Sequence, residues 1–503
     1  MQQPIKAIIA VLFLSSNPTV LLQTVNPWQV AADQTRWIQA QASILAGEPI
    51  EEEYTTRLLD LSGREVARFA GKFDQFSPDG ARLLTASSKI QVAYLFDRSG
   101  RKLLQFNRNI AEFSPDGRLL AVVDGGTNYL YDASGRELAQ LPGRFLGAPI
   151  FSPDSQRIVS FAEDSTYLLN AAGQQIAQIQ GPFRKVLLGN GFSPDSQQFV
   201  MCQRLEPCFL FNASGQLLTQ LEGEFIGFSP DGQKLITSDG DSNNPILNLY
   251  NRSGQKIAQL PGAYSIFSPV FSPDGQLFLV SNEIVGDTSY LYNSSGEAVA
   301  QLRGADGKFS SSGKFLVTVS NKTVYLYNIA GNEIAQVPGE QAAFLPGSET
   351  FVTFIWRVGG IQSFVSLGGE SRLFESATGS LVLLQGELNS LEVMLFGTDI
   401  IPSTLSNGPY KIELSFVSSD GQCLVTTDSE ASYLYDAAGN QLAQLPGVFQ
   451  KFSPNGQYFV TTIDDTIYLF DRSGTKRLEI AGEFRSFSPD GQHLVITTQN
   501  SVH

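Results

Sequence analysis

One short motif recurs from end to end of this sequence. A phenylalanine followed by Ser-Pro-Asp-Gly, or by a close variant of it, occurs eleven times. Successive motifs are 35 to 43 residues apart, except for one interval of 72 residues, which holds either one repeat with insertions or one repeat and a degenerate partner. A period of about 40 residues predicts a chain built from stacked copies of one structural unit. The motifs start at Phe76, Phe113, Phe151, Phe192, Phe228, Phe271, Phe309, Phe344, Phe416, Phe452 and Phe487.

Each repeat predicts four short strands. The proline and the glycine of Ser-Pro-Asp-Gly suit a tight turn. A strand such as residues 234–238 follows this turn, then a variable loop, and then a strand such as residues 129–131. A second turn, such as Asp132 to Gly135, combines an Asx-type hydrogen bond with a glycine that tolerates positive φ. Short strands with turn signals every 8–12 residues or so are typical of antiparallel all-β proteins, and four strands per repeat are typical of a propeller blade.

From Tyr54 to about Thr498 the repeats resemble those of the WD-repeat β-propeller family. In that family a strand ends in Trp-Asp, and here pairs such as Tyr131-Asp132 and Phe470-Asp471 hold that position. The family's Gly-His is represented by a glycine such as Gly143, without the histidine. A related group of extracytoplasmic propellers with Ser-Pro-Asp-Gly repeats is similar as well. The resemblance implies an all-β propeller of four-stranded blades.

The two ends of the repeat region complement each other. The C-terminal end stops after one turn and one strand, 487–498, and the N-terminal end begins with the missing half, 56–69. The count of eleven balances only if the two ends share a blade, which removes exposed strand edges and closes a circle. Because about four to eight blades per ring are usual, we expect two adjoining rings, with one large ring as the alternative.

The N-terminal region, residues 1–50, lacks the repeat and is expected to be a short extension of the propeller region, residues 54–500. Its apolar run, Ala7–Leu14, is too short to span a bilayer. Apolar residues between Trp28 and Leu45 are spaced as on one face of a helix. We expect a cytoplasmic protein, and the alternative is an exported protein, or one attached to a membrane through residues 1–25.

Composition excludes several classes of function. The chain has 503 residues and a formal net charge of −15, which argues against nucleic acid as a partner. Only two histidines occur, so histidine-based catalytic triads and metal sites are not expected, and no nucleotide-binding, hydrolase or zinc signature is present. Cys202 and Cys208 flank one expected hairpin; unpaired buried thiols are favoured over a disulfide, which would need an oxidising compartment. No cofactor is expected.

The loops opposite the two recurrent turns vary most, and variable loops on one face usually mark the binding face. The two largest insertions, residues 355–370 and 388–413, belong to the same repeat. If they emerge side by side, they bring together aromatic and other residues of the kind that anchors protein partners. Packing of the insertions on each other is the competing interpretation. The candidate partner-binding residues are Trp356, Arg357, Phe364, Met394, Phe396 and Tyr410.

The variable loops are also rich in carboxylates, which would attract a basic partner or a metal ion. Asp239, Asp241 and Asn243 alternate as the oxygen ligands of calcium loops do, but Tyr250 stands where such a loop has its final glutamate, so they are a weak candidate. The other loop carboxylates are Asp124, Glu163, Asp164, Glu206, Glu283, Asp287, Asp428, Glu430, Asp464 and Asp465.

The sequence therefore predicts a non-catalytic propeller that presents its variable loops to a protein partner, and the carboxylates of those loops fit a basic one. The alternative is a propeller enzyme, or a receptor for a small ligand or metal, with carboxylates that converge on the central channel. The fold alone does not separate these functions.

Overall fold

A computed structural model of the chain describes residues 54–499, apart from the gaps given below. For residues 354–358, 366–375 and 380–384 it describes the backbone only. The helix expected within residues 28–45 lies outside the described residues. The gaps are 88–91, 108–109, 125–126, 145–148, 163, 182, 185–190, 204–206, 240–245, 262–268, 283–287, 359–365, 376–379, 385–415 and 428–430.

The described residues form antiparallel sheets, nearly all of four strands, as predicted for a β-propeller. The sheet built from both ends of the chain, called the closing sheet, contains β1 (Tyr54–Asp60), β2 (Glu65–Ala70), β42 (Glu483–Phe487) and β43 (His493–Gln499). The next sheets along the chain are β3 (Lys72–Phe76), β4 (Arg82–Ala86), β5 (Val92–Asp97) and β6 (Lys102–Asn107); β7 (Ile110–Phe113), β8 (Leu119–Asp124), β9 (Thr127–Asp132) and β10 (Glu137–Arg144); β11 (Ile150–Phe151), β12 (Arg157–Phe161), β13 (Ser165–Asn170) and β14 (Gln175–Gln180); and β15 (Phe183–Arg184), β16 (Gln198–Gln203), β17 (Cys208–Asn212) and β18 (Leu217–Leu221).

The remaining sheets repeat the same order of strands. They are β19 (Glu224–Phe228), β20 (Lys234–Asp239), β21 (Ile246–Asn251) and β22 (Lys256–Pro261); β23 (Val270–Phe271), β24 (Leu277–Asn282), β25 (Thr288–Asn293) and β26 (Ala298–Arg303); β27 (Ala305–Phe309), β28 (Phe315–Ser320), β29 (Thr323–Asn328) and β30 (Glu333–Pro338); β31 (Gln341–Phe344), β32 (Thr350–Val358), β33 (Ser366–Glu375) and β34 (Ser380–Leu384); β35 (Cys423–Thr427), β36 (Ala431–Asp436) and β37 (Gln441–Pro446); and β38 (Val448–Phe452), β39 (Tyr458–Ile463), β40 (Thr466–Asp471) and β41 (Lys476–Ala481).

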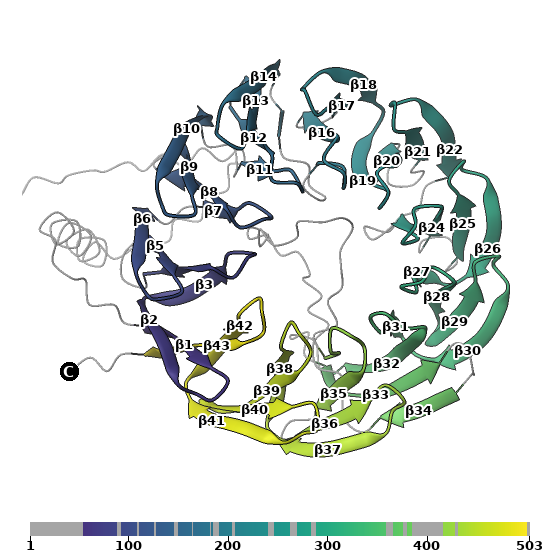
Figure 1. Cartoon of the computed structure of the whole chain (residues 1–503). Helices are drawn as coiled ribbons and strands as arrows, with labels where there is room; N and C mark the ends of the chain where they lie inside the picture. Colours follow the sequence, from purple (N-terminus) through teal and green to yellow (C-terminus); the bar gives the residue numbers. More distant parts are fainter. Residues whose placement is uncertain are drawn as a thin grey trace, which may run out of the picture. The chain divides into compact units, whose positions relative to one another are not determined.

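The closing sheet joins the two ends of the repeat region, as the sequence predicted. β1 pairs with β43 over its whole length, from Tyr54 opposite Gln499 to Asp60 opposite His493. β2 and β42 complete the sheet on either side, in the order β2-β1-β43-β42. Figure 1 shows β43 beside β1, so strands more than 400 residues apart in the sequence are hydrogen-bonded neighbours.

Apolar contacts run through all the sheets in chain order and return to the start. Each buried cluster draws its side chains from sheets that follow one another in the chain, and one cluster joins β39 and β40 to the closing sheet. Two adjoining rings would break this order, and the clusters of the described residues show no break, so they favour the alternative of one large ring over the expected two. The described residues of the 72-residue interval form one four-stranded sheet, β31–β34, so that interval supplies one sheet before the motif at Phe416 begins the next.

Burial follows the position of a strand within its sheet. All five residues of β4, a second strand, are buried, because neighbouring sheets cover both of its faces. In β22, a fourth strand, Leu260 is buried and Ala258 is partly buried against the next sheet, while Lys256, Ile257 and Gln259 are exposed. The continuous apolar pattern of inner strands and the alternating pattern of outer strands follow from this difference.

Candidate interaction face

The antiparallel order divides each sheet into two ends. The turns between the first and second strands and between the third and fourth strands lie at one end, which we call the turn face. The loops between the second and third strands, and the links from one sheet to the next, lie at the opposite end, which we call the loop face. The two recurrent turn motifs therefore share the turn face, as the sequence predicted, and β32 and β33, which contain the described ends of the first insertion, meet at the loop face.

The serine of the Ser-Pro-Asp-Gly motif holds its turn together from inside. In the motif that follows β19, the Ser229 hydroxyl donates to Asp231 Oδ1 at 2.5 Å and accepts from the backbone N–H of Lys234 at 2.9 Å. Ser229 is fully buried. These bonds satisfy polar groups that would otherwise be buried without partners, so the serine and the aspartate serve the turn rather than a ligand.

In the second recurrent turn, Asp-x-Ser-Gly, the polar groups also form hydrogen bonds with one another. Asp60 Oδ1 accepts hydrogen bonds from the hydroxyl of Ser62 at 2.6 Å and from the backbone N–H of Arg64 at 3.0 Å. The hydrogen bond from the Ser62 hydroxyl is the largest influence on Asp60, and its pKa is lowered to about 2. Gly63 has a φ of 84°, a backbone conformation that residues with a Cβ rarely adopt, so a substitution there would strain the turn.

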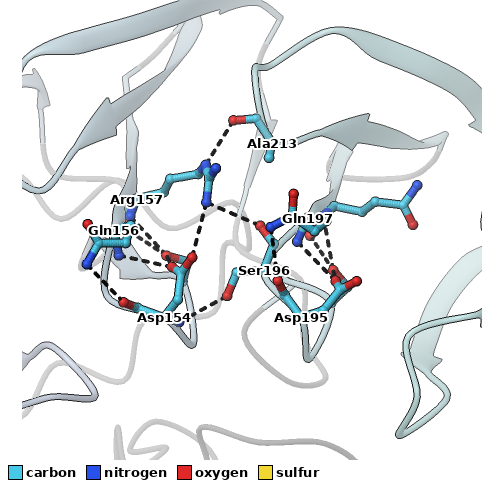
Figure 2. A network of polar contacts seen from close by, with 10 residues as sticks. Asp154, Gln156, Arg157, Asp195, Ser196, Gln197 and Ala213 are labelled. Atoms are coloured by element: carbon cyan, nitrogen blue, oxygen red, sulfur yellow. Dashed lines mark hydrogen bonds and ion pairs between the residues drawn. The ribbon is translucent and has the colours of Figure 1, made fainter.

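Side chains of the turn face also bind neighbouring sheets to each other (Figure 2). The backbone N–H of Asp154 donates to the hydroxyl of Ser196, in the corresponding turn of the next sheet, at 3.0 Å. Arg157 donates to the carbonyl oxygen of Ala213, also in the next sheet, at 3.0 Å. Gln198 repeats this contact one sheet further on, with the carbonyl oxygen of Arg252 at 2.6 Å. The polar groups of the turn face therefore have structural tasks.

The closing sheet has its own connection on the turn face. Arg98, in the turn between β5 and β6, donates to Asp490 Oδ2 at 3.0 Å, and its guanidinium lies 2.9 Å from His493 Nδ1. Burial and the positive charge of Arg98 lower the pKa of His493, although Asp490 opposes the shift. A neutral His493 accepts this hydrogen bond, so the contact is suited to an uncharged imidazole.

Two of the candidate partner-binding residues lie in a strand that extends the loop face. The Thr353 hydroxyl of β32 donates to the carbonyl oxygen of Pro338, and the Thr85 hydroxyl of β4 donates to the carbonyl oxygen of Ala70 in the same way. Thr353 and Thr85 therefore hold equivalent positions in their sheets, and the lengths of β32 and β4 can be compared from there. β4 ends one residue later, at Ala86, whereas β32 runs on to Val358 and contains Trp356 and Arg357. Trp356 is paired with Gly369 of β33. Phe364, Met394, Phe396 and Tyr410 lie outside the described residues.

A cavity of about 430 Å³ opens on the loop face between the sheet that ends with β18 and the sheet that begins with β19. The Glu222 carboxylate pairs with Lys256, and the backbone N–H of Glu222 donates to the hydroxyl of Tyr250 at 3.0 Å. Asp239 also lines the cavity, so the lining holds two acidic residues, one of which is already paired with a lysine. The lining residues are Pro207, Gln220, Leu221, Glu222, Gly223 and Asp239.

A disulfide joins Cys202 of β16 to Cys208 of β17 beside this cavity. The register pairs the two residues directly across the hairpin, with their Cα atoms 4.0 Å apart, which brings the sulfur atoms within bonding reach. The expectation of two unpaired thiols is therefore wrong. Cys423 remains free and buried, and burial raises the pKa of its thiol.

The weak calcium candidate is not assembled by the described residues. Asp239 is the last residue of β20, and Asp241 and Asn243 lie outside the described part. Within the described ranges, no three carboxylate, cysteine or histidine side chains gather as metal ligands would. Of the other loop carboxylates, Asp124 accepts a hydrogen bond from Asn107 at 2.6 Å, and the backbone oxygen of Asp465 accepts one from Gly482 at 2.7 Å.

Sequence reasoning did not single out Glu222, Gln220 or Lys308. Lys308, on the inner strand β27, donates to the carbonyl oxygen of Ala342 in the next sheet at 2.9 Å, and burial lowers the pKa of its ammonium group. A lysine directly before a motif phenylalanine was a visible signal, because that position faces the neighbouring inner strand. No comparable signal marked Glu222, since the cavity depends on how two sheets meet.

Among the residues that the structure describes, none forms a helix long and apolar enough to cross a lipid bilayer.

Comparison with known proteins found matches among solved structures. No protein-family model and no curated protein matches the chain. Similar solved structures include one described as a eukaryotic initiation factor, with 12% identity and a TM-score of 0.43, in an alignment that covers 90% of this chain and 100% of that one. The C-terminal WD40 domain of Sif2 is 13% identical, with a TM-score of 0.32 and coverage of 51% and 78%. Dihydro-heme d1 dehydrogenase NirN, in complex with DHE, is 16% identical, with a TM-score of 0.33 and coverage of 58% and 76%.

Proposed function

We propose that this protein is a non-catalytic interaction scaffold that binds a partner protein through its loop face. The observation that carries the proposal is the division of labour between the two faces. On the turn face, serine, aspartate and arginine side chains are committed to turns and to neighbouring sheets, as Ser229, Asp60 and Arg157 illustrate. The loop face holds the insertions and the cavity, so recognition is assigned to that face.

The scaffold we propose is one propeller ring, with the eleven sheets as its blades and the closing sheet as the point where the chain joins itself. The unbroken order of apolar contacts supports one ring rather than two. A ring of this kind holds its loops in fixed relative positions without any catalytic group, which is what a docking surface needs.

The partner site we propose is the pair of insertions, residues 355–370 and 388–413. The extension of β32 beyond the end of β4 supports it, because it carries Trp356 and Arg357 to the loop-face end of their sheet. Phe364, Met394, Phe396 and Tyr410 complete the proposed cluster. Large aromatic and arginine side chains are the residues that most often dominate binding energy at protein interfaces.

A pull-down from the native source tests this site. The wild-type chain is compared with a Trp356→Ala/Phe396→Ala variant and with Arg136→Ala, a control whose exposed side chain pairs with Asp132 on the turn face. We expect one partner to be recovered by the wild type and by the control, and to be lost by the double variant. Equal recovery by all three proteins would contradict the site.

The cavity supports a second candidate, a receptor for a cationic group, because its lining holds two acidic residues, Glu222 and Asp239, and a lysine is paired with the first of them. The same pull-down distinguishes the two candidates when Asp239→Asn is added to the set. Loss of the partner with Asp239→Asn, together with its retention by Trp356→Ala/Phe396→Ala, would move recognition from the insertions to the cavity.

The disulfide between Cys202 and Cys208 supports the exported alternative over the cytoplasmic one, because disulfides persist mainly in oxidising compartments. Thiol labelling of the chain during the same preparation tests this point. Protein from the exported fraction should label only at Cys423 after unfolding, whereas labelling of all three cysteines before reduction would favour the cytoplasm.

A further inference from the structure

Among the described residues, the fourth strand of each four-stranded sheet has no neighbouring strand on its outer edge. Such edges pair with other chains unless charge, proline or irregular backbone protects them. Most of these outer strands carry protection: β22 begins with Lys256 and ends with Pro261, and β30 begins with Glu333 and ends with Pro338. β22 and β30 also have a bulge where they pair with the third strand of their sheets. Because this bulge recurs between sheets, it does not explain why one outer edge would be better protected than another.

Two neighbouring outer strands have the bulge but lack charge and proline. β14 reads Gln-Ile-Ala-Gln-Ile-Gln and β18 reads Leu-Leu-Thr-Gln-Leu, with no charged residue and no proline in either. Among outer strands whose side chains the structure describes, these are the two without such residues. Six residues with two isoleucines, no charge and no proline match the composition of segments that readily pair edge to edge. Figure 1 shows β14 and β18 as the outer strands of adjacent sheets.

The side chains of β14 are open on one face. Gly215 of the next sheet lies so close to Ala177 that a Cβ added to the glycine would be 2.5 Å from the Ala177 Cβ. The next sheet therefore covers the face of β14 that carries Ala177 and Ile179. On the other face, Ile176 is 43% exposed and Gln178 is exposed. In β18, the outer strand of the adjacent sheet, Leu217 is 51% exposed. An added strand would therefore meet a free backbone edge flanked by aliphatic and amide groups.

We propose that the β14 edge is a self-association site, where β14 pairs antiparallel with β14 of a second copy of the chain. A two-fold axis at Gln178 would place Ile176 opposite Gln180 of the other copy, with no like charges in the ladder. The same operation on β22 would bring in Lys256 and leave Pro261 without an N–H to donate. With a net charge of −15 on each copy, an uncharged edge is where two copies meet with the least repulsion.

Sedimentation velocity of the purified full-length protein tests this proposal. We expect a concentration-dependent dimer that strengthens with added salt, because salt screens the repulsion between two acidic chains. Ile176→Lys should raise the dimer dissociation constant at least about tenfold, since it places a charge in the paired edge. The matched control is Ile257→Lys in β22, where the wild-type residue is 38% exposed, and it should change the constant less than about twofold.

Thermal unfolding of both lysine variants separates loss of pairing from loss of folding. A wild-type protein that stays monomeric up to about 100 µM would overturn the proposal, since weaker pairing would be negligible at ordinary protein concentrations. A dimer that Ile176→Lys and Ile257→Lys weaken equally would overturn it as well. Dimerisation that survives both substitutions would show that another surface joins the two copies.

Discussion

Ser196 holds a backbone conformation that glycine holds in most of the corresponding turns. Its φ is 60°, and Ser155 in the preceding sheet has the same value. A non-glycine residue with positive φ is strained, so its side chain must offer compensation. In both turns the serine hydroxyl accepts a backbone N–H from the turn of the preceding sheet, at 3.0 Å. Serine at this position is more strained than glycine would be, but its hydroxyl forms a hydrogen bond to the neighbouring sheet that glycine could not form.

Two substitutions separate the strain from the bond. Ser196→Ala keeps the positive φ but removes the acceptor for the N–H of Asp154, so we expect it to lower the free energy of unfolding by about 1–2 kcal/mol. Ser196→Gly loses the same bond but relieves the strain, so its loss should be smaller by roughly 1 kcal/mol. Urea unfolding measures both values. A glycine variant less stable than the alanine variant would contradict the strain assigned to the positive φ, and an alanine variant as stable as the wild type would contradict the role given to the hydroxyl.

At this scale, the sequence predicted the turns but not the contacts between them. Proline and glycine in Ser-Pro-Asp-Gly indicate a tight turn from local chemistry alone. The bond from Asp154 to Ser196 joins residues 42 positions apart and exists only because neighbouring sheets pack with their turns side by side. A pattern within one repeat contains no information about that distance.

Among the structural elements, the closing sheet carries a pH-sensitive contact. Because burial and Arg98 lower the pKa of His493 below 6.5, the folded protein binds a proton there less readily than the unfolded chain does. The stability contributed by neutral His493 is complete above about pH 6.5 and is lost as the pH falls from there toward the lowered pKa.

We expect the melting temperature of the wild type to fall between about pH 7.5 and pH 5 in part through this residue. His493→Gln keeps an acceptor for Arg98 without a titrating group, so its melting temperature should fall less over the same range. His503→Gln, at the other histidine, is the control and should follow the wild type. Identical pH profiles for all three proteins would contradict the role of His493.

The sequence correctly predicted which strands join the two ends of the repeat region. It did not predict which residues face each other across a hairpin, because that depends on the register between paired strands. The complementary half-repeats at the two ends correctly predicted the closing sheet, since each half supplies two paired strands, β1 with β2 and β42 with β43, and the sheet is completed where β1 pairs with β43. The sequence favoured unpaired thiols at Cys202 and Cys208, because only the register of β16 on β17 shows that the two residues face each other. The aromatic candidates in the insertions stay predictions, apart from the placement of Trp356 and Arg357 in β32.

In the whole molecule, each sheet is stabilised mainly by the two sheets beside it. The buried clusters join consecutive sheets, and the last of them joins β40 to the closing sheet. The sequence predicted repeating units but not how many enter one circle, because contacts between neighbouring units are the same in a small ring and a large one. The order of the contacts supplies that missing information.

The most direct test of the proposed scaffold is a set of cryo-electron microscopy averages of the purified chain viewed along the axis of its repeat region. Eleven sheets that close through β1 and β43 predict a single ring with eleven spokes and no gap. Two smaller rings, or an open arc with a gap at the closing sheet, would contradict the single ring on which the division into a structural turn face and a recognition loop face depends.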